Sequence, residues 1–292
     1  MLENSQSQVY NDQMKVSGKV VAEEILQNLK KEIEGKSLNP GLAIILAGDN
    51  PASRIYVNNK IKAAESIGIN VNLYEFSKEE EEKCLQTIDQ LNSDEGVHGM
   101  IVQYPTYDAW DFEKVSSRVA LEKDVDGFQE GSPFRGATAL AVWEMIGAFA
   151  KHEGFKNTEE FLKGKKIVIL GKGRTAGRPS IELLRDKGFE ITIVDSKTEN
   201  PNLVVRDADL VISATGKKNI VNGSNIKEGV YVIGVGVGKE IIDGESKIYG
   251  DINESDVSQK AKLYCPTIGG IGPLTIACLL RNVTEASKSG NH

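Results

Sequence analysis

The sequence predicts an α/β protein of two α/β domains with a cleft between them, the second a Rossmann-like doubly wound parallel sheet. The chain has 292 residues, which is too long for one ordinary domain and comfortable for two. Short apolar strand patterns alternate with helical patterns and polar turns, and this order is typical of parallel β-α-β units rather than of a sandwich. A glycine-rich turn follows an apolar strand in the second half, as in nucleotide-binding sheets.

In the first half, residues 17–34 repeat apolar side chains near a 3.6-residue period and predict an amphipathic helix. Apolar runs closed by turn residues predict strands at 42–47, 70–76 and 99–105. Helices are predicted between them, at 53–67 and 78–92. A glycine-rich loop over 127–139 then leads into a helix over 140–149.

The second half begins near residue 164 with a strand at 165–170, a glycine-rich turn at 171–179 and a helix at 180–188. Further strands are predicted at 189–195, 208–215, 231–237 and 262–267. The last helix, 274–286, follows the completed sheet, and we infer that it crosses back to pack on the first domain. The predicted domains are therefore residues 1–146 with 274–292, and residues 147–273.

Composition excludes several classes of protein. The formal net charge is −7 and no basic cluster stands out, so a nucleic-acid partner is not expected, whereas a small anionic ligand is compatible. No apolar run reaches the roughly 18 residues of a membrane helix, and the polar N-terminus is not a secretory signal, so we expect a cytoplasmic protein. Spacing disfavours a disulfide framework and a metal site for the three cysteines, Cys84, Cys265 and Cys278.

The clearest dinucleotide signal is the turn that contains Gly171, Gly173 and Gly177, directly after an apolar strand. Glycines there let the backbone approach a pyrophosphate, and the next helix offers its positive N-terminus. The third glycine comes one residue later than in the usual pattern. The alternative is an ordinary tight turn between a strand and a helix.

The end of the next strand leaves the choice of dinucleotide open. An acid such as Asp195 at this position hydrogen-bonds the ribose hydroxyls of NAD and repels the extra phosphate of NADP. Lys172, Arg174, Ser196 and Lys197, however, could together hold that phosphate. The residues point both ways.

One helix of the first half could carry a base. Ser53, Tyr56 and Lys60 are spaced to share one helical face, and burial could lower the pKa of the lysine beside the aromatic ring. The alternative is a solvated lysine whose stem covers a packed tyrosine. Gln103 ends a strand, on the rim where parallel sheets place their ligands.

Two loops complete the set of candidates. Asp124 and Asp126 are separated by one residue and could be a turn cap or acceptors for a ring N–H donor. Residues 265–275 pack three glycines and two prolines between a strand and a helix. Such rigidity is typical of backbone that passes close to a ligand or turns sharply.

Taken together, these segments resemble the bifunctional methylenetetrahydrofolate dehydrogenase/methenyltetrahydrofolate cyclohydrolase family. The resemblance spans residues 17–286, and its pieces occur in the family's order. They are PASRIYVNNKIKAAESIGI, HGMIVQYP, EKDVDGF, GKGRTAGRP, DSKT, ADLVISATGK, GDI and PTIGGIGPLT. Any one piece is weak, but the ordered set is specific.

The resemblance implies a role for each matching residue. Lys60 would be the key group of a hydrolytic step, Tyr56 would pack on the folate, Gln103 would hydrogen-bond Lys60 and keep it neutral, and Asp126 would bind the pterin ring. The substrate would also contact Gly270 and Pro273. The dinucleotide would be held by Gly171, Lys172, Gly173, Arg174, Thr175, Gly177, Asp195, Ser196, Ala214, Thr215, Gly216 and Thr275.

The implied enzyme is an oxidoreductase and hydrolase of one-carbon metabolism that supplies purine biosynthesis. It would oxidise 5,10-methylenetetrahydrofolate with NADP and hydrolyse the product to 10-formyltetrahydrofolate, as a homodimer and without a metal. The family usually has arginine, serine and histidine where Lys172, Gly173 and Asp195 stand, so NAD is the alternative cofactor. Two rival functions are a shikimate-type or amino-acid dehydrogenase and a non-catalytic dinucleotide-binding module.

Overall fold

The computed structural model describes residues 14–242 and 245–289. Within it the chain separates into two compact units. The first unit contains residues 23–137 and the C-terminal helix from Ile276, and the second unit contains residues 14–22 and 138–275. The polar N-terminal residues 1–13, for which we expect no secretory signal, lie outside the described part. The domain boundaries expected from the sequence, 1–146 with 274–292 and 147–273, stay a prediction.

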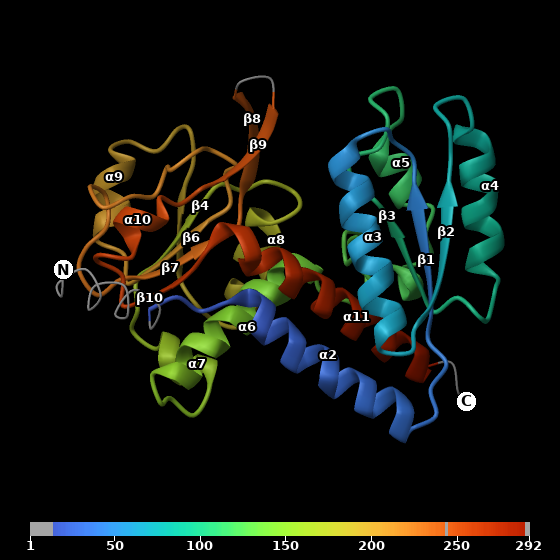
Figure 1. Ribbon diagram of the computed structural model, residues 1–292, viewed down its shortest axis with the longest axis horizontal. Coiled ribbons are helices and arrows are strands. Elements are labelled where there is room, and N and C mark those ends of the chain that lie inside the picture. The colour runs from blue at the N-terminus through green and yellow to red at the C-terminus, as the bar shows by residue number, and fades with distance from the viewer. Residues whose placement is uncertain (1–13, 243–244, 290–292) are drawn as a thin grey trace. The chain divides into compact units, whose positions relative to one another are not determined.

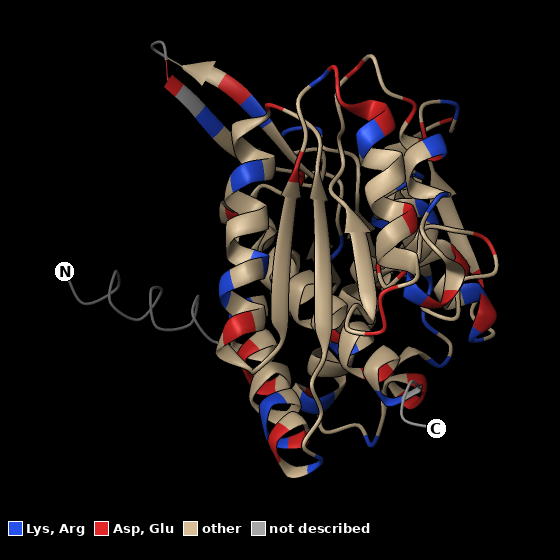
Figure 2. Cartoon of the chain, turned by 90° about the vertical axis from the view of Figure 1, so that its right-hand side faces the viewer, with Lys and Arg blue, Asp and Glu red and all other residues tan. Residues whose placement is uncertain are grey.

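The first unit is built on a parallel sheet with the strand order β2-β1-β3. The strands lie side by side in Figure 1 and are almost free of charged residues in Figure 2, whereas the helices beside them carry many. The strands are β1 (Gly41–Leu46), β2 (Asn70–Glu75) and β3 (Gly99–Val102). The helices are α2 (Gly18–Gly35), α3 (Pro51–Ser66), α4 (Glu81–Asn92), α5 (Phe112–Ser116), a 3-10 turn at Leu121–Lys123, and α11 (Gly272–Ser289).

Helices cover both faces of this sheet. Alternate residues of β1, such as Leu42 and Ile44, pack in a cluster with side chains of α2, α3 and α11. The residues between them, Ala43 and Ile45, pack with α4 and α5. Because both faces are buried, β1 is apolar throughout rather than alternating. Leu280 of α11 is fully buried in the first cluster, so the last helix packs against the sheet of the first unit.

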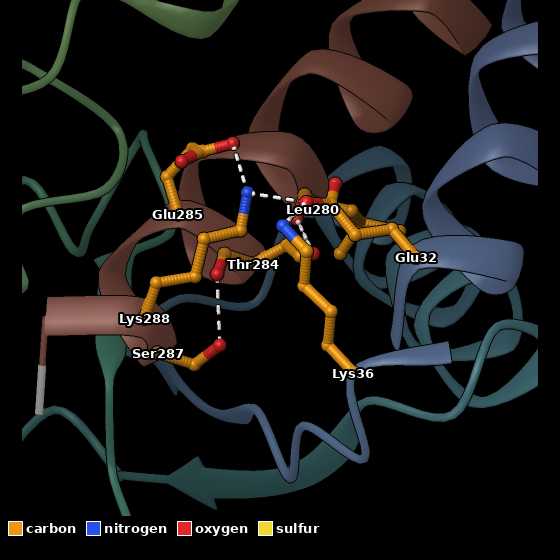
Figure 3. A network of polar contacts seen from close by, with 7 residues as sticks. All are labelled: Glu32, Lys36, Leu280, Thr284, Glu285, Ser287 and Lys288. Carbon is orange, nitrogen blue, oxygen red and sulfur yellow. Dashed lines mark hydrogen bonds and ion pairs between the residues drawn. The ribbon is translucent and has the colours of Figure 1, made fainter. Parts of the chain in front are cut away.

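A polar network joins α2 to α11 at the edge of that cluster (Figure 3). The Lys288 amine contacts carboxylate oxygens of Glu285 at 2.6 Å and of Glu32 at 2.7 Å, and Lys36 contacts Glu32 at 2.7 Å. Beneath it, the Thr284 hydroxyl donates to the Leu280 carbonyl. Partly exposed pairs of this kind each stabilise by about 0–1 kcal/mol, so the apolar cluster holds α11 in place.

The second unit contains a parallel sheet with the order β10-β7-β6-β4-β5. Along the chain the strands of this sheet are β4, β5, β6, β7 and β10. β5 lies on one side of β4 and β6 lies on the other side, so the order is doubly wound, with a switch point between β4 and β6. The Rossmann-like prediction is confirmed. The strands are β4 (Ile167–Leu170), β5 (Ile191–Val194), β6 (Leu210–Ser213), β7 (Tyr231–Gly234) and β10 (Leu263–Cys265).

Several predicted boundaries are corrected in this unit. The helix expected over 140–149 is α6 (Ala137–His152), because Ala137 and Ala139 are already buried. The helix expected from 180 is α8 (Gly177–Asp186), because a proline is tolerated in the first turn of a helix. The remaining helices are too short for a periodic signal: α7 (Thr158–Leu162), α9 (Pro201–Arg206) and α10 (Glu254–Val257).

The strand expected over 231–237 is wrong at its end. It stops at Gly234, and an antiparallel hairpin of β8 (Val237–Ile242) and β9 (Glu245–Gly250) follows. At Gly236 a Cβ would lie 2.4 Å from the Asp251 carboxylate, so the chain passes too close to that acid for any side chain. The close approach separates what appeared in the sequence as one apolar run.

Two absences hold for the described residues. None of their helices is both long enough and apolar enough to cross a membrane. Nowhere in the same ranges do three or more His, Cys, Asp or Glu side chains gather in a way that could hold a metal ion.

Candidate functional site

Lys60 lies on the inner face of α3, directly after β1. The helix is started by Asn50, whose side chain accepts from the Ala52 N–H, and by Pro51 in the first helical turn. Lys60 shares the buried side of this helix with Ser53, as the spacing predicts. Only 4% of Lys60 is exposed, so the alternative of a solvated lysine is wrong.

The Lys60 amine lies among polar and aromatic groups of the first unit. Its Nζ donates to Oε1 of Gln103 at 3.1 Å and lies 5.0 Å from the centre of the Tyr56 ring. Gln103 in turn donates through Nε2 to the Tyr104 carbonyl at 2.8 Å. This second hydrogen bond holds the amide oxygen toward the amine. The strand-rim position predicted for Gln103 therefore places it against Lys60.

Electrostatics favour the uncharged amine. Burial lowers the pKa of Lys60, and the negative charge of Asp126 opposes that shift. Burial likewise raises the pKa of Asp126, and Lys60 opposes it. Gln103 accepts a hydrogen bond without adding a counter-charge. A lysine whose pKa is lowered by burial can take up a proton and return it more readily than an exposed lysine.

The two carboxyl groups of the acidic loop, Asp124 and Asp126, have different surroundings. Asp124 accepts from the Gln129 N–H at 2.9 Å, and its own carbonyl accepts from the Ser132 hydroxyl at 3.0 Å. Asp124 is thus a turn cap, and Asp126 is the acid whose charge acts on the pKa of Lys60. Asn282 of α11, which the sequence reasoning missed, ties this loop by donating Nδ2 to the Val125 carbonyl at 2.8 Å.

The glycine-rich turn of the second unit has the geometry of a phosphate cradle. Gly171 has φ +88°, and a Cβ there would lie 2.5 Å from the Ala214 carbonyl oxygen. A Cβ at Gly177 would lie 2.3 Å from the Gly171 oxygen. At Gly173, by contrast, nothing lies within 4 Å of an added Cβ. The turn thus packs tightly on one side and has open space at Gly173, where a ligand can approach the backbone.

A hollow of about 450 Å³ opens at this turn, at the switch point of the sheet. Its volume lies in the usual range for small-molecule sites. The predicted residues that line it are Gly171, Lys172, Gly173, Asp195, Ser196, Ala214 and Thr215. The residues present therefore fit the adenosine half of a dinucleotide.

The other predicted cofactor and substrate residues lie elsewhere in the second unit. Arg174 and Thr175 are on the exposed part of the turn, and Gly177 begins α8. Gly216 has φ +69°, beyond the end of β6. The segment from Gly270 through Pro273 to Thr275 starts α11, and the Thr275 hydroxyl donates to the Ile271 carbonyl at 3.0 Å.

The segment before α11 bends sharply, as its glycines and prolines predict. Gly269 has φ +76°, and Gly270 lies so close to the start of α2 that a Cβ on Gly18 would meet the Gly270 oxygen at 1.8 Å. This packing between backbones needs glycine at position 18, and a Cβ on Gly270 would meet the Cys265 Sγ at 2.6 Å.

Asp251 is a further residue that the sequence reasoning did not single out. It is fully buried, and its carboxylate accepts from the Ser213 hydroxyl at 2.9 Å and from the Thr215 N–H at 2.8 Å. It thereby fixes the chain after β6, where Ala214 and Thr215 line the hollow. The signal in the sequence is a lone acid in the short piece GDI, which is too brief to be interpreted alone.

Replacing Asp251 with alanine is expected to weaken dinucleotide binding by about tenfold or more, the equivalent of at least 1.4 kcal/mol. The buried Ser213 hydroxyl and Thr215 N–H lose their acceptor, at a cost of about 1–3 kcal/mol for each group left unsatisfied. Calorimetric titration and urea unfolding measure both effects. Asp207→Ala is the control, since that side chain is 69% exposed. Unchanged affinity in Asp251→Ala would mean that the acid does not shape the hollow.

Comparison with known proteins adds the following. Residues 16–126 match the family described as tetrahydrofolate dehydrogenase/cyclohydrolase, catalytic domain, and residues 137–291 match its NAD(P)-binding domain. The bifunctional protein FolD of Caldanaerobacter subterraneus subsp. tengcongensis is 35% identical over 284 residues, which cover 94% of this chain and 97% of that protein.

Two solved structures are similar over nearly the whole chain. The bifunctional enzyme FolD, a methylenetetrahydrofolate dehydrogenase/cyclohydrolase from Campylobacter jejuni, has a TM-score of 0.84 at 34% identity and covers 94% of this chain and 98% of its own. The Trypanosoma brucei methylenetetrahydrofolate dehydrogenase-cyclohydrolase, in complex with NADP and an inhibitor, has a TM-score of 0.85 at 28% identity and covers 95% and 98%.

Proposed function

The chain belongs to the tetrahydrofolate dehydrogenase/cyclohydrolase family, and on that premise we propose that it carries out both reactions of the family. It oxidises 5,10-methylenetetrahydrofolate to the 5,10-methenyl compound with NADP, and it hydrolyses that compound to 10-formyltetrahydrofolate. The product is a formyl donor of one-carbon metabolism, of the kind that purine biosynthesis consumes.

One observation carries the hydrolytic half of this proposal. The Lys60 amine is buried, is hydrogen-bonded to a neutral amide oxygen, and has a lowered pKa. Water that adds to the methenyl carbon must lose a proton, and the folate nitrogen that departs when the ring opens must gain one. An uncharged Lys60 amine can take the first proton and give it to the second atom. The hydroxyl left on that carbon loses the second proton of the water to solvent as the formyl C=O forms, so hydrolysis of the cationic methenyl compound releases one proton overall.

The surrounding residues take supporting roles in this proposal. Gln103 orients the amine and keeps it uncharged, Tyr56 packs on the folate, and Asp126 accepts from the pterin ring. Gly270 and Pro273 are proposed to contact the substrate as well. The partly buried position of Asp126 beside Lys60 supports its assignment to the ring rather than to a turn.

The second unit is proposed to hold the dinucleotide, with its adenosine half in the hollow after β4. When bound, the nicotinamide ring accepts the hydride that leaves the methylene carbon. The chain's own contribution is to hold the phosphates against the backbone of the 171–177 turn and to orient the two rings. Arg174, Thr175, Gly177, Gly216 and Thr275 complete the proposed cofactor contacts.

The remaining assignments follow from the family. We propose that the chain acts as a cytoplasmic homodimer and that its folding domains divide as the sequence predicts. A shikimate-type or amino-acid dehydrogenase, the first rival, would not explain the arrangement of Tyr56, Lys60 and Gln103. A non-catalytic dinucleotide-binding module, the second rival, would not explain why a buried lysine is kept uncharged.

A spectrophotometric assay tests the proposed function. Methylenetetrahydrofolate is mixed with the chain and with NADP or NAD in parallel, and reduced nicotinamide and methenyl absorbance are followed. The expected result is hydride transfer followed by decay of the methenyl signal. Turnover of shikimate or of amino acids in its place, or cofactor binding with no reduction when the folate is added, would contradict the proposal.

A further inference from the structure

An ion pair occupies the end of the hollow where the adenosine ribose of a dinucleotide is expected. The Lys172 amine lies 2.8 Å from Oδ2 of Asp195. Lys172 comes from the glycine-rich turn after β4, and Asp195 is the first residue after β5. Both side chains line the hollow, together with Ser196 and Thr198. The two residues that gave opposite indications in the sequence are therefore in direct contact.

The acid is the fixed member of the pair. Its Oδ1 accepts from the Lys197 N–H at 2.9 Å, and the Asp195 N–H donates to the Thr198 hydroxyl at 2.9 Å. Only 22% of the Asp195 side chain is exposed, against 61% of Lys172. The lysine stem is flexible, so its amine can move toward a second anion while the carboxylate stays in place.

This arrangement has opposite consequences for the two dinucleotides. A fixed carboxylate after the second strand accepts hydrogen bonds from the ribose hydroxyls of NAD. The 2′-phosphate of NADP would lie beside the same carboxylate and be repelled by it. Lys172 lies close enough to offset that repulsion, because one amine can donate to a carboxylate and to a phosphate at once.

We propose that the Lys172–Asp195 pair makes the site accept both dinucleotides, with Asp195 favouring NAD and Lys172 admitting NADP. The inference rests on the proposed function in that a nicotinamide dinucleotide must bind the hollow. It goes further by assigning the choice between the two cofactors to one ion pair. Asp195 and Lys172 are thus specificity-determining residues of this chain.

The test is calorimetric binding of NAD and NADP to the full chain and to two variants. Asp195→Asn keeps the oxygen that accepts from Lys197 but removes the charge, and it is expected to tighten NADP about tenfold without tightening NAD. Lys172→Met is expected to weaken NADP about tenfold and NAD much less. The ratio of the two affinities therefore moves in opposite directions in the two variants.

Lys166→Met is the matched control, because it removes the lysine of another exposed ion pair, with Asp207 at 2.6 Å, at the opposite end of β4. Its affinity ratio is expected to equal that of the parent chain. A ratio unchanged in Asp195→Asn and in Lys172→Met would overturn the inference while leaving the proposed function intact. Failure of the parent chain to bind either dinucleotide would overturn both.

Adenosine 2′,5′-bisphosphate and 5′-AMP provide a second readout that does not depend on the nicotinamide end. The same shifts in ratio are expected with these two probes. The preference for the bisphosphate should also fall as salt is raised, because Lys172 is largely exposed and its charge is screened. Shifts seen with the dinucleotides but absent with these fragments would contradict a role at the ribose.

Discussion

Replacing Lys60 with methionine is expected to slow hydrolysis of methenyltetrahydrofolate by about 100- to 10,000-fold, the usual contribution of a placed acid–base group. Hydride transfer to the dinucleotide should stay measurable, because the neighbouring folate nitrogen stabilises the cation and that step needs no proton transfer. Separate assays of the two steps on one preparation measure the difference.

The matched control is Lys62→Met on the same helix, where the lysine is exposed. Both activities of this variant are expected to equal those of the parent. If Lys60→Met lowered both activities by one factor while its fold stayed intact, the assignment of Lys60 to the hydrolytic step would be wrong.

Stability provides an internal check on the Lys60 variant. Because burial lowers the pKa of this lysine, the unfolded chain binds a proton that the folded chain does not, between the lowered pKa and the ordinary value of about 10.4. Stability therefore rises with pH across that window, and the buried amine costs free energy below it. Methionine removes this cost, so the unfolding midpoint of Lys60→Met at neutral pH should be no lower than that of the parent chain.

Replacing Gly171 with alanine is expected to abolish dinucleotide binding and to destabilise the second unit by several kcal/mol. A positive φ costs an L-residue about 1–2 kcal/mol. At Gly171 a Cβ would in addition lie 2.5 Å from the Ala214 carbonyl oxygen, which belongs to the backbone and cannot move aside without reshaping the hollow. Urea unfolding and calorimetric titration measure the two effects.

Gly164→Ala is a control that separates the cost of a positive φ from the cost of the close contact between a Cβ and the backbone. Gly164 also has a positive φ, +75°, but nothing lies within 4 Å of its added Cβ. This control should be destabilised only by the cost of the backbone conformation, and it should bind the dinucleotide as the parent chain does. Equal losses in the two variants would show that the close approach at Gly171 has no energetic consequence.

The sequence predicted the parts of the fold that have a strong period or a strong local signal. The buried runs at β1 and β4 and the helical period of α2 leave few alternatives, because a strand buried on both faces is apolar throughout and an amphipathic helix has one apolar face. Gln103 was predicted from its place at a strand end, since parallel strands present their carboxyl ends on one rim. The contact between Gln103 and Lys60 then follows from the order of the strands.

Other parts could not be predicted because their cause lies in tertiary contacts. The β8–β9 hairpin is separated from β7 by the approach of Gly236 to Asp251, residues fifteen positions apart whose contact leaves no local pattern. Asp251 itself looks like any surface acid until its partners are known. The ion pair between Asp195 and Lys172 likewise forms between two separate loops. The sequence alone therefore could not show that these residues are in contact, and it left the choice between NAD and NADP open.

Whether the Lys60 amine is uncharged in the folded chain is tested most directly by an NMR titration with ¹³C-labelled lysine, in which the Lys60 Cε signal is assigned by its loss in Lys60→Met. The Lys60 signal is expected to titrate below the ordinary pKa of a lysine side chain, because the amine is buried against Gln103 and Tyr56. A Lys60 signal that titrates near about 10.4, the value of a lysine in a model peptide, would contradict the assignment of Lys60 as an uncharged base.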